Sequence, residues 1–556
     1  MNDYFAKCHT SLVYKNKNKH MNKLLKIKAL VTIFFCCLSL TMLHATLALP
    51  NIPATQYLIT NYGALTSSLD NSTAINAAIT AASTTGGGTV VIPAGTFLSG
   101  PITMKSNVNL YISAGAILQL MPYGTGNGTP AGSYPNNGTT DSYANFIYGQ
   151  NLNNIEISGS GTIEGNGNDW WAAYKANSNV SRPCVIRFKA CNTVLITGIT
   201  IQNAPNVHIT LGQSGSARGS NGTISYVTIS APSNSPNTDA IDTWYWNDIE
   251  IHHCTLSEGD DNVAIDSYTK NIKISNCTLG TGHGISVGSY TTDVQNVSVD
   301  SCTFSGTTNG IRLKSNRTRG GQDSTFVYTN ITMNNVQYPF YITSWYDSEP
   351  YPASSQTATT VTSTTPIWKN ITFKNITVTN ATYGGIIYGL PEAYVKNIVF
   401  DNVKISATSK GLVADFIDGL QFINCSSITI PGGKGNAIMS GPSTTTGTPY
   451  NATISGINTT SGVSTSCTSS GIEEVSAAPK FSCFPNPLIG DNLTIKSDNK
   501  ISKVRIYSLT GVEIKEIAGN HLTQLPINLI GVQAGYYLIN VLLENGTSSS
   551  VKLIKE

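Results

Sequence analysis

Four short motifs gather chemically reactive side chains in a chain that is otherwise poor in charge. They are Asn237-Thr238-Asp239, Gly259-Asp260-Asp261, Gly282-His283-Gly284 and Arg312-Leu313-Lys314. Only 12% of the 556 residues are Asp, Glu, Lys or Arg, so three carboxylates, one imidazole and two cations at near-regular intervals stand out. Crowding raises the pKa of at least one carboxyl group, which can then donate a proton while an ionised neighbour activates water. The motifs therefore indicate acid–base chemistry, provided that the fold brings them together.

The spacing of the motifs suggests how they meet. Asp239 lies 21 residues before Asp260, and Asp260 lies 23 residues before His283. If one structural repeat has about this length, the three side chains form a column on neighbouring strands, which in a sheet lie about 4.8 Å apart. Asp260 and Asp261 would point to opposite faces of a regular strand. Both reach one cleft only if the backbone bends, which Gly259 permits.

Such a repeat is present. Seven segments share an apolar–polar–apolar alternation followed by a turn residue, which is typical of a half-buried strand. They begin at Ile249, Ile272, Val297, Ile331, Ile371, Ile398 and Leu420, at spacings of 23, 25, 34, 40, 27 and 22 residues. None contains a run with helical periodicity, so the repeat predicts an all-β solenoid, a right-handed parallel β-helix. Cys254, Cys277 and Cys302 occupy equivalent positions in it and are expected to face the core.

The rest of the chain is organised around this solenoid, which we assign to residues 49–440. Ser72–Ala82 is expected to form a short helix, with Ser72 as its N-cap, that closes the first coil. Gly86–Pro93 then enters the first coils. Residues 441–478 are interpreted as a Ser/Thr/Gly-rich linker. Residues 479–556 are expected to form a small antiparallel β-sandwich, because short alternating runs recur at Lys503–Tyr507, Tyr536–Leu543 and Val551–Ile554.

Residues 1–48 are expected to be a targeting region, with Met21 as the true start. Three lysines precede the apolar run Ala29–Leu43, as in a secretory signal peptide. This run is shorter than the roughly 20 residues that a membrane span needs, and no later segment is long and apolar enough. Export permits disulfides, and Cys184 and Cys191 are close enough in sequence to pair. The formal net charge of +2 gives no reason to expect nucleic acid as a partner.

Residues 55 to about 440 resemble glycoside hydrolase family 28, the polygalacturonase family. The four motifs above match its signature in order and spacing. Further matches are Tyr62-Gly63-Ala64, Gly86-Gly87-Gly88, Gly161-Thr162-Ile163-Glu164-Gly165, Trp170-Trp171, Arg182-Pro183 and Asn203-Ala204-Pro205. Residues 484–556 resemble the C-terminal sorting domain of the type IX secretion system of Bacteroidota. The matching residues are Phe484-Pro485-Asn486-Pro487, Ile506–Gly511, Gly535-Tyr536-Tyr537 and Val551–Lys555.

The resemblance implies a secreted or cell-surface bacterial enzyme that hydrolyses α-1,4-galacturonosyl linkages of pectin with inversion. It makes Asp260 the general acid, while Asp239 and Asp261 activate water and His283 supports the acid or the substrate. It implies substrate contacts from Asn237, Arg312, Lys314 and Tyr346. Two cations on one strand face suit a sugar that carries its own carboxylate. We expect no metal or cofactor, a galacturonan substrate, the secretion machinery as partner of the C-terminal domain, and a monomer.

Two other functions remain open at this point. A pectate lyase is also a β-helix, but would use calcium and a basic residue for β-elimination. A catalytically silent β-helix would only bind polysaccharide. In that case the aspartates would cap turns, His283 would be an ordinary turn residue, and Arg312 and Lys314 would form a solvated strand face. The order of the motifs favours hydrolysis, and endo and exo cleavage both stay possible.

Overall fold

The computed structural model describes residues 47–124, 132–137, 142–213, 215, 217–348, 357–424, 426–430, 438–440, 452–454, 481–508, 513–533, 535–545 and 548–555. The expected targeting region, with Met21, lies outside these residues except for its last two, and most of the expected linker lies outside them too. The chain divides into two compact units, Met1–Cys467 and Thr468–Glu556. Among the described residues, no helix is long and apolar enough to cross a bilayer.

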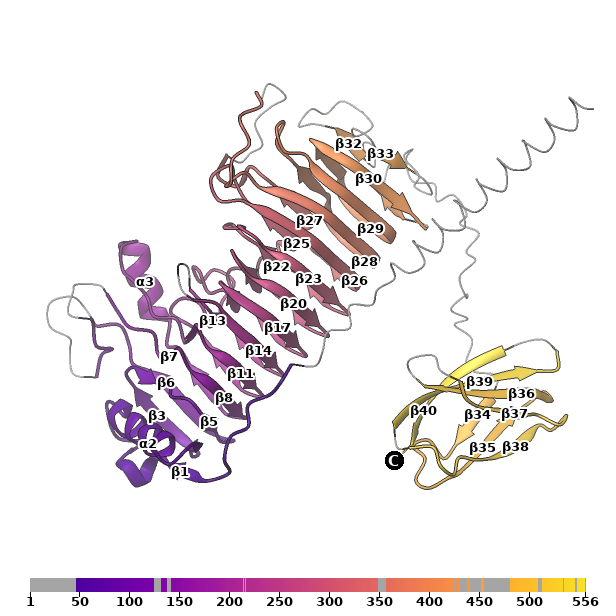
Figure 1. Cartoon of the computed structure of the whole chain (residues 1–556), viewed down its shortest axis with the longest axis horizontal. Helices are drawn as coiled ribbons and strands as arrows, with labels where there is room; N and C mark the ends of the chain where they lie inside the picture. Colours follow the sequence, from indigo (N-terminus) through magenta and orange to yellow (C-terminus); the bar gives the residue numbers. More distant parts are fainter. Residues whose placement is uncertain are drawn as a thin grey trace, which may run out of the picture. The chain divides into compact units, whose positions relative to one another are not determined.

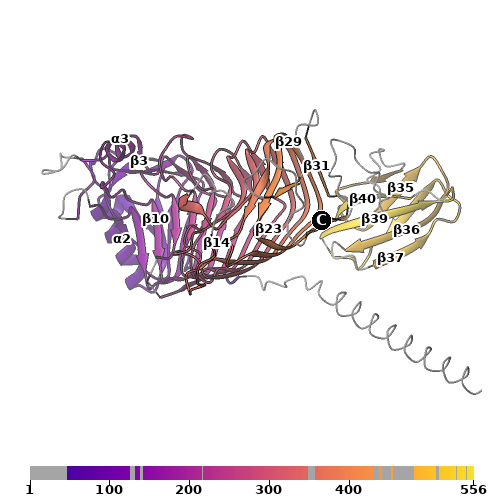
Figure 2. The same cartoon turned by 90° about the horizontal axis from the view of Figure 1, so that it is seen from above.

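The first unit is the expected parallel β-helix, whose strands stack coil upon coil (Figures 1 and 2). Each coil contributes strands to three parallel ladders. The first ladder runs through β1 (Gln56–Leu58), β2 (Gly88–Ile92), β5 (Val108–Ile112), β8 (Asn153–Gly159), β11 (Asn192–Thr197), β14 (Gly219–Ser225), β17 (Trp246–His252), β20 (Lys270–Ser275), β23 (Gln295–Asp300), β26 (Gln322–Asn334), β28 (Ile367–Tyr388), β29 (Val395–Asp415), β30 (Ile417–Ile423) and β33 (Ala452–Ile454).

The second and third ladders complete each coil. The second contains β3 (Gly95–Ser99), β6 (Ala116–Leu120), β9 (Thr162–Glu164), β12 (Thr200–Gln202), β15 (Thr228–Ser230), β18 (Thr255–Ser257), β21 (Thr278–Leu279), β24 (Thr303–Ser305) and β31 (Ser427–Thr429). The third contains β4 (Ile102–Thr103), β7 (Ile147–Gln150), β10 (Ile186–Lys189), β13 (Ile209–Leu211), β16 (Ile241–Thr243), β19 (Val263–Ile265), β22 (Ile285–Val287), β25 (Asn309–Lys314), β27 (Tyr338–Thr343) and β32 (Ile438–Ser440). The long strands β26, β28 and β29 pass through more than one ladder.

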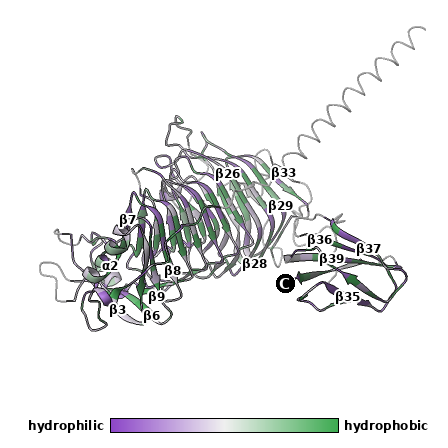
Figure 3. Cartoon of the chain, turned by 60° about the horizontal axis from the view of Figure 1, so that its bottom comes forward, coloured by the Kyte–Doolittle hydropathy of each residue, from purple (hydrophilic) through white to green (hydrophobic). Residues whose placement is uncertain are grey.

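The core forms because residues of like kind stack on successive coils. Hydrophobic residues recur along the strands of the solenoid (Figure 3). Phe373 and Phe400 pack with ring centroids 4.8 Å apart, and Phe400 stacks on Phe422 at 4.7 Å. Cys254, Cys277 and Cys302 are buried in this core, as expected. Each coil thus buries its inner face against its neighbours.

Asparagine side chains form ladders from coil to coil, at corners and near the starts of strands such as β20 and β23. Many corner residues have a left-handed backbone, which Asn tolerates better than most residues. The amide of Asn296 donates to Asn271 at 2.8 Å, and the amide of Asn271 donates to Asp248 at 2.8 Å. Such ladders satisfy the polar side chains of neighbouring coils and keep the coils in register.

The register corrects one of the seven expected repeat units. Val297 pairs with Phe326, which pairs with Ile371, so the fourth unit begins at Phe326 and not at Ile331. Ile331 lies five residues further on, in the second-ladder part of β26, where it pairs with Ile376. Both parts of this 13-residue strand show the same alternation, so the pattern alone does not distinguish them. The ladder also continues past residue 440, because β33 pairs with β30 inside the segment assigned to the linker.

The N-terminal helix forms with different capping from that expected. α2 spans Ser72–Thr84 and packs on the first coils through Ala74, Ile75, Ala78, Ile79 and Ala82. Asn71, and not Ser72, occupies the N-cap position. Ser72 is the first helical residue, and both its amide and its hydroxyl donate to the carboxylate of Asp70. The two other described helices are η1 (Ile59–Tyr62) and α3 (Asn168–Ala176), besides the single turn η2 (Tyr346–Ser348).

The cysteine pairing suggested by proximity is wrong. Cys184 and Cys191 are both buried and both carry free thiols. Cys191 immediately precedes β11, and its Sγ lies 3.3 Å from the carbonyl oxygen of Lys189. The strand β10 lies between the two cysteines and holds them apart.

The second unit is the expected antiparallel β-sandwich. One sheet contains β34 (Phe481–Phe484), β35 (Asn492–Ser497) and β38 (Gln524–Asn528). The other contains β37 (Glu513–Ala518), β36 (Ile501–Ser508), β39 (Gly535–Leu543) and β40 (Ser548–Lys555). Both sheets contribute to one core cluster, which includes Ile495, Ile527, Ile506 and Val541. This unit therefore has a hydrophobic core of its own.

Candidate active site

The candidate site lies where the chain enters three successive strands of the third ladder. Ile241, Val263 and Ile285 are register partners in β16, β19 and β22. Counting two residues back from each gives Asp239, Asp261 and His283. The column is therefore built from Asp261, whereas the spacing of the motifs suggested Asp260.

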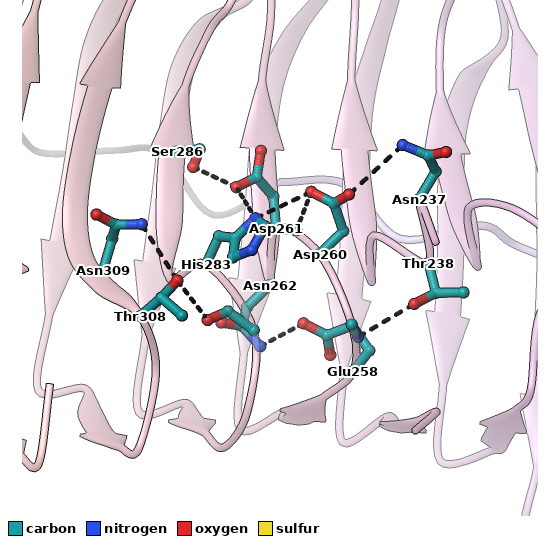
Figure 4. A network of polar contacts seen from close by, with 12 residues as sticks. Asn237, Thr238, Glu258, Asp260, Asp261, Asn262, His283, Ser286, Thr308 and Asn309 are labelled. Carbon is teal, nitrogen blue, oxygen red and sulfur yellow. Dashed lines mark hydrogen bonds and ion pairs between the residues drawn. The ribbon is translucent and has the colours of Figure 1, made fainter. Parts of the chain in front are cut away.

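Asp260 reaches the same place from the turn before β19. Neither Asp260 nor Asp261 lies in a strand, so the alternation of a regular strand does not separate them. Nδ1 of His283 lies 3.1 Å from Oδ1 of Asp260 and 3.8 Å from Oδ1 of Asp261. The amide of His283 also donates to the carbonyl oxygen of Asp260 at 2.7 Å. The two carboxylates and the imidazole thus converge as expected (Figure 4).

Three side chains from later coils surround the carboxylate of Asp261. Lys314 donates to its Oδ2 at 2.7 Å, Arg312 donates to its Oδ1 at 3.2 Å, and Ser286 donates to its Oδ1 at 2.6 Å. The side chains of Asp261 and Lys314 are only 3% and 7% exposed, so their ion pair is sheltered from water. Arg312 and Lys314 share a face of β25, as expected, and both are ion-paired to a residue of the protein.

Electrostatics separates two of the carboxyl groups. For Asp261, burial acts to raise the pKa, but the charges of Lys314 and Arg312 outweigh burial and lower it. For Asp239, burial and the neighbouring carboxylates Asp242, Asp260 and Asp261 together raise the pKa well above its usual value. Burial, together with crowding, therefore raises the pKa of Asp239, and Asp239 is not the residue that the resemblance makes the general acid. Asp261 is held ionised.

Asn237 lies at the rim of the site, in a left-handed turn with φ of 53°. Its amide nitrogen lies 3.5 Å from Oδ2 of Asp260, while its amide oxygen accepts a hydrogen bond from Arg182 at 2.7 Å. Arg182 also donates to the carbonyl oxygens of Pro205 and Pro236. This buried guanidinium joins the turns before two coils and so fixes the start of the Asn237-to-Asp239 segment.

The backbone of Asp239 is held by His208. The carbonyl oxygen of Asp239 accepts from the amide of His208 at 2.9 Å, and Nδ1 of His208 lies 3.0 Å from the same oxygen. Nε2 of His208 lies 3.4 Å from the amide of Ala204, which donates to it. Burial lowers the pKa of His208 to about 4, so the ring is neutral. A neutral ring can donate from Nδ1 to the carbonyl oxygen of Asp239 while Nε2 accepts from the amide of Ala204.

Glu258 is buried two residues before Asp260 and lies below it in the view of Figure 4. The amide of Asn262 donates to its Oε1, while its Oε2 has no hydrogen-bond partner among the residues that the structure describes. Burial raises its pKa well above the usual value, and the carboxylates of the site raise it further. Asn262 also donates to the carbonyl oxygen of Thr281 and accepts from the amide of Gly284 at 2.8 Å. The pair thus ties the turns before β19 and β22 together.

Tyr346 lies beside the cations in the short helix η2 (Tyr346–Ser348). Its ring centroid is 5.2 Å from Nζ of Lys314 and 5.5 Å from the guanidinium carbon of Arg312. Its amide donates to the carbonyl oxygen of Ser315 at 3.0 Å. The eight residues predicted for the site therefore form one contiguous group, apart from Asp239, whose side chain makes no hydrogen bond among the described residues.

A metal ion is sterically possible here, which spacing in the sequence did not suggest. Ligand atoms of Asp260, Asp261 and His283 lie within 4.8 Å of one another. However, Lys314 and Arg312 already neutralise Asp261 and would repel a cation bound to it. The three side chains could therefore supply ligand atoms to a metal ion. The ion pairs of Asp261 with Lys314 and Arg312 nevertheless disfavour a further cation and favour a neutral group next to Asp261.

Sequence reasoning missed several supporting residues. The strand pattern could have identified Ser286, because a polar residue between the apolar Ile285 and Val287 must face outward. Its register partner Arg312 marks the same face. No comparable signal identified Glu258 or His208, because their importance comes from contacts across coils that the sequence alone does not align.

Two family models match the chain. Residues 83–433 match the glycosyl hydrolases family 28 model, which is more than half of the chain. Residues 482–556 match the secretion system C-terminal sorting domain. The second match shows a type IX sorting domain, and the chain is therefore a secreted or cell-surface bacterial protein.

Curated relatives and solved structures agree with the first match. The chain is 34% identical to a probable polygalacturonase of Arabidopsis thaliana over 47% of its length and 55% of that protein. It is 34% identical to an endo-polygalacturonase of Pectobacterium carotovorum over 46% of its length and 66% of that protein. The chain thus spans about half to two thirds of these relatives.

The structural comparisons cover more of the solenoid. The polygalacturonase from Erwinia carotovora aligns with a TM-score of 0.52 and 29% identity, over 65% of this chain and 95% of that one. An exopolygalacturonase from Thermotoga maritima aligns with a TM-score of 0.56 and 22% identity, over 72% of this chain and 94% of that one. The second likeness shows the fold alone.

Proposed function

Because the chain belongs to glycosyl hydrolase family 28, we propose that it hydrolyses α-1,4-galacturonosyl linkages of pectic galacturonan outside the cell. The observation that carries the proposal is the convergence of Asp260, Asp261 and His283 next to two cations. Carboxyl groups in different electrostatic environments are what glycoside hydrolysis requires. The relative from Pectobacterium carotovorum is an endo-polygalacturonase, and the solved structure from Erwinia carotovora is a polygalacturonase.

The proposed mechanism uses the three carboxyl groups in different ways. Asp260 protonates the leaving glycosidic oxygen. Its side chain is 23% exposed, so a sugar can approach it. The side chain of His283 is 34% exposed, and its Nδ1 lies 3.1 Å from Oδ1 of Asp260. Asp261 accepts the proton of the attacking water, because Lys314 and Arg312 keep it ionised. Asp239 helps to orient that water. The assignment of acid and base, and inversion of configuration, rest on the family resemblance.

The cations have a double role in this proposal. Lys314 and Arg312 hold Asp261 ionised, and Nε of Arg312 is buried and has no hydrogen-bond partner within the described part of the chain. Arg312, Lys314, Tyr346 and Asn237 line the approach to the carboxylates, and a sugar carboxylate is the ligand that suits them.

Product analysis tests the function. The purified protein is incubated with unmethylated polygalacturonate, and reducing ends and ultraviolet absorbance are followed together. We expect new reducing ends without an unsaturated product. Binding of the polymer without any product would leave only the non-catalytic function. The same time course, read as oligomers or as monomer, distinguishes endo from exo cleavage.

Lyase chemistry is the second candidate, because the cluster of Asp260, Asp261 and His283 has the dimensions of a cation site. A calcium-dependent lyase would release an unsaturated, ultraviolet-absorbing product and would lose activity with chelator. Hydrolysis by the proposed residues should be unaffected by chelator, because Asp261 is already paired with the ammonium group of Lys314 and needs no metal ion to balance its charge.

A further inference from the structure

Three sequence motifs that carry no part of the proposed mechanism are joined to the rim of the candidate site. They are Trp170-Trp171, Arg182-Pro183 and Asn203-Ala204-Pro205. Their side chains and carbonyl groups contact one another, and the last contact is with the amide of Asn237. The three motifs therefore form one structural unit with a residue of the site.

The unit begins in the helix α3, which two tryptophans anchor. The ring of Trp170 meets that of Tyr143 edge-on, with centroids 4.8 Å apart, and both rings are buried. Nε1 of Trp171 donates to the carbonyl oxygen of Ala204 at 3.0 Å. Tyr174 follows the tryptophans by four and three residues, so it lies on the same side of the helix. The anchored helix thus holds Tyr174 in place.

Arg182 links the helix to the site. The ring of Tyr174 covers its guanidinium group, whose carbon lies 3.8 Å from the ring centroid. Nη1 of Arg182 donates to the carbonyl oxygens of Pro205 at 2.8 Å and Pro236 at 2.6 Å. Nη2 donates to Oδ1 of Asn237 at 2.7 Å. Because the guanidinium is a rigid plane held at three points, the direction of Nη2 is fixed.

This contact determines which way the side-chain amide of Asn237 points. A guanidinium has donors and no acceptor, so the amide oxygen of Asn237 must face Arg182. The amide nitrogen then faces the other way, where it lies 3.5 Å from Oδ2 of Asp260 (Figure 4). Removal of the guanidinium frees the amide to turn over, which would set its oxygen against the carboxyl oxygens of Asp260.

We propose that Arg182 is a positioning residue. It holds the amide of Asn237 with the NH2 group toward Asp260 and the sugar bound there, and Tyr174 holds Arg182 in turn. The reaction and the sugar are those of the proposed function, on which this inference rests. Since Arg182 acts through Asn237, the two residues make one shared contribution to the reaction and not two separate ones.

A double-mutant cycle in the full chain tests this shared contribution. It compares Arg182→Gln, Asn237→Ala and the combined variant with the wild type on unmethylated polygalacturonate. We expect each single variant to lose about tenfold in kcat/KM, as for one hydrogen bond to a charged group. The combined variant should be no worse than the more impaired single variant. Losses that multiply in the combined variant, or no loss in Arg182→Gln, would overturn the proposal.

Two further variants separate orientation from charge and from folding. Arg182→Lys keeps the charge but lacks the planar fork, so it should stay impaired, and full activity in this variant would contradict the proposal. Asn237→Asp keeps an oxygen for Arg182, and with it the melting temperature, but has no NH2 group. It should lose at least as much kcat/KM as Asn237→Ala. Wild-type activity in Asn237→Asp would show that the NH2 group is not needed.

Arg218→Gln is the matched control. Nη1 of Arg218 donates to Oδ1 of Asn247 at 3.2 Å, and its guanidinium carbon lies 5.5 Å from the ring centroid of Tyr268. The residue thus makes the same two kinds of contact, but beside β14 and β17 of the first ladder, whereas the candidate site is on the third. Its loss should leave kcat/KM within about twofold of the wild type.

Thermal unfolding without substrate separates this proposal from the proposed function. If the contact between Arg182 and Asn237 exists, the combined variant should melt no lower than Arg182→Gln alone. Losses in melting temperature that simply add would contradict the contact, whatever the protein hydrolyses. A wild type that releases no new reducing ends would defeat the proposed function and the positioning role with it. Hydrolysis by the wild type together with losses in kcat/KM that multiply would defeat the positioning role alone.

Discussion

At the residue scale, the same side-chain type behaves in opposite ways within one cluster. Asp261 and Asp239 are two carboxyl groups at equivalent positions of adjacent coils. The pKa of Asp261 is lowered by Lys314 and Arg312, while that of Asp239 is raised by burial and by its acidic neighbours. Position in the solenoid, and not residue type, therefore determines which group is ionised. The column therefore holds a carboxyl group whose pKa is lowered beside one whose pKa is raised.

Asp260→Asn tests the acid directly. The amide keeps the shape of the side chain and its contact with His283, but cannot deliver a proton. We expect hydrolysis to fall by about 10²–10⁴-fold while oligomer binding and the melting temperature are retained. Turnover within a few-fold of the wild type would remove Asp260 from this role.

Lys314→Met tests how Asp261 is kept ionised. Without the ammonium group the pKa of Asp261 rises, so the acid limb of the pH profile of kcat/KM is expected to move to higher pH. The sign follows from the lowered pKa: the ion pair stabilises the fold above the unfolded pKa of Asp261, and this stability is lost as pH falls. Removing one partner of a buried pair also costs about 3–5 kcal/mol of folding free energy.

The control for this variant is Lys396→Met, which changes the same charge at an exposed position. It should leave both the pH profile and the melting temperature unchanged. If Lys314→Met is folded and active with an unshifted acid limb, Asp261 is not the base.

The residue types of the site could be predicted from the sequence, but their contacts could not. Asp239, Asp260, Asp261 and His283 stood out because the chain has few charges. That Lys314 pairs with Asp261 could not be read from a separation of 53 residues. Only the ladder register shows which residue of one coil lies against which residue of the next.

At the element scale, the turns before β16, β19 and β22 do the positioning. Strand alternation predicted the solenoid, because its core stacks like residues on successive coils. It misplaced the coil at Ile331, where the 13-residue β26 repeats its own pattern after a corner. Turn geometry is set by buried polar contacts such as that of Glu258 with Asn262, for which the alternation carries no signal.

Glu258 provides the test of turn positioning. Glu258→Gln keeps the neutral shape that the buried side chain already has, with its oxygen facing Asn262. Glu258→Ala removes the acceptor and leaves a cavity. We expect the Gln variant to keep kcat within about twofold, and the Ala variant to lose about tenfold or more in kcat together with melting temperature.

A merely structural role for Glu258 gives a different result. The Ala variant would then melt at a lower temperature but keep its kcat well below that temperature. A Gln variant as impaired as the Ala variant would show that the ionisable proton of Glu258, and not its shape, is required.

At the scale of the whole molecule, the chain combines two units with separate cores. The residues of the site all lie between Asn237 and Tyr346, within the solenoid. The sorting domain begins its own sheet at Phe481 and buries its own apolar residues. Both architectures could be predicted from the strand pattern. The boundary was less clear, since β33 pairs within a segment whose Ser/Thr-rich composition suits a linker equally well.

Truncation after Cys467 tests whether the units are independent. Each unit has its own core, so the truncated chain should fold, hydrolyse galacturonan at the wild-type rate and keep its melting temperature for the solenoid. In a bacterial host with the type IX system, the truncated chain should no longer reach the medium or the cell surface. The measurements are activity, thermal unfolding and the distribution of protein between cells and medium. An aggregated or inactive truncated chain would instead mean that the second unit caps the open end of the solenoid, because an uncapped last coil exposes strand edges that pair with other chains.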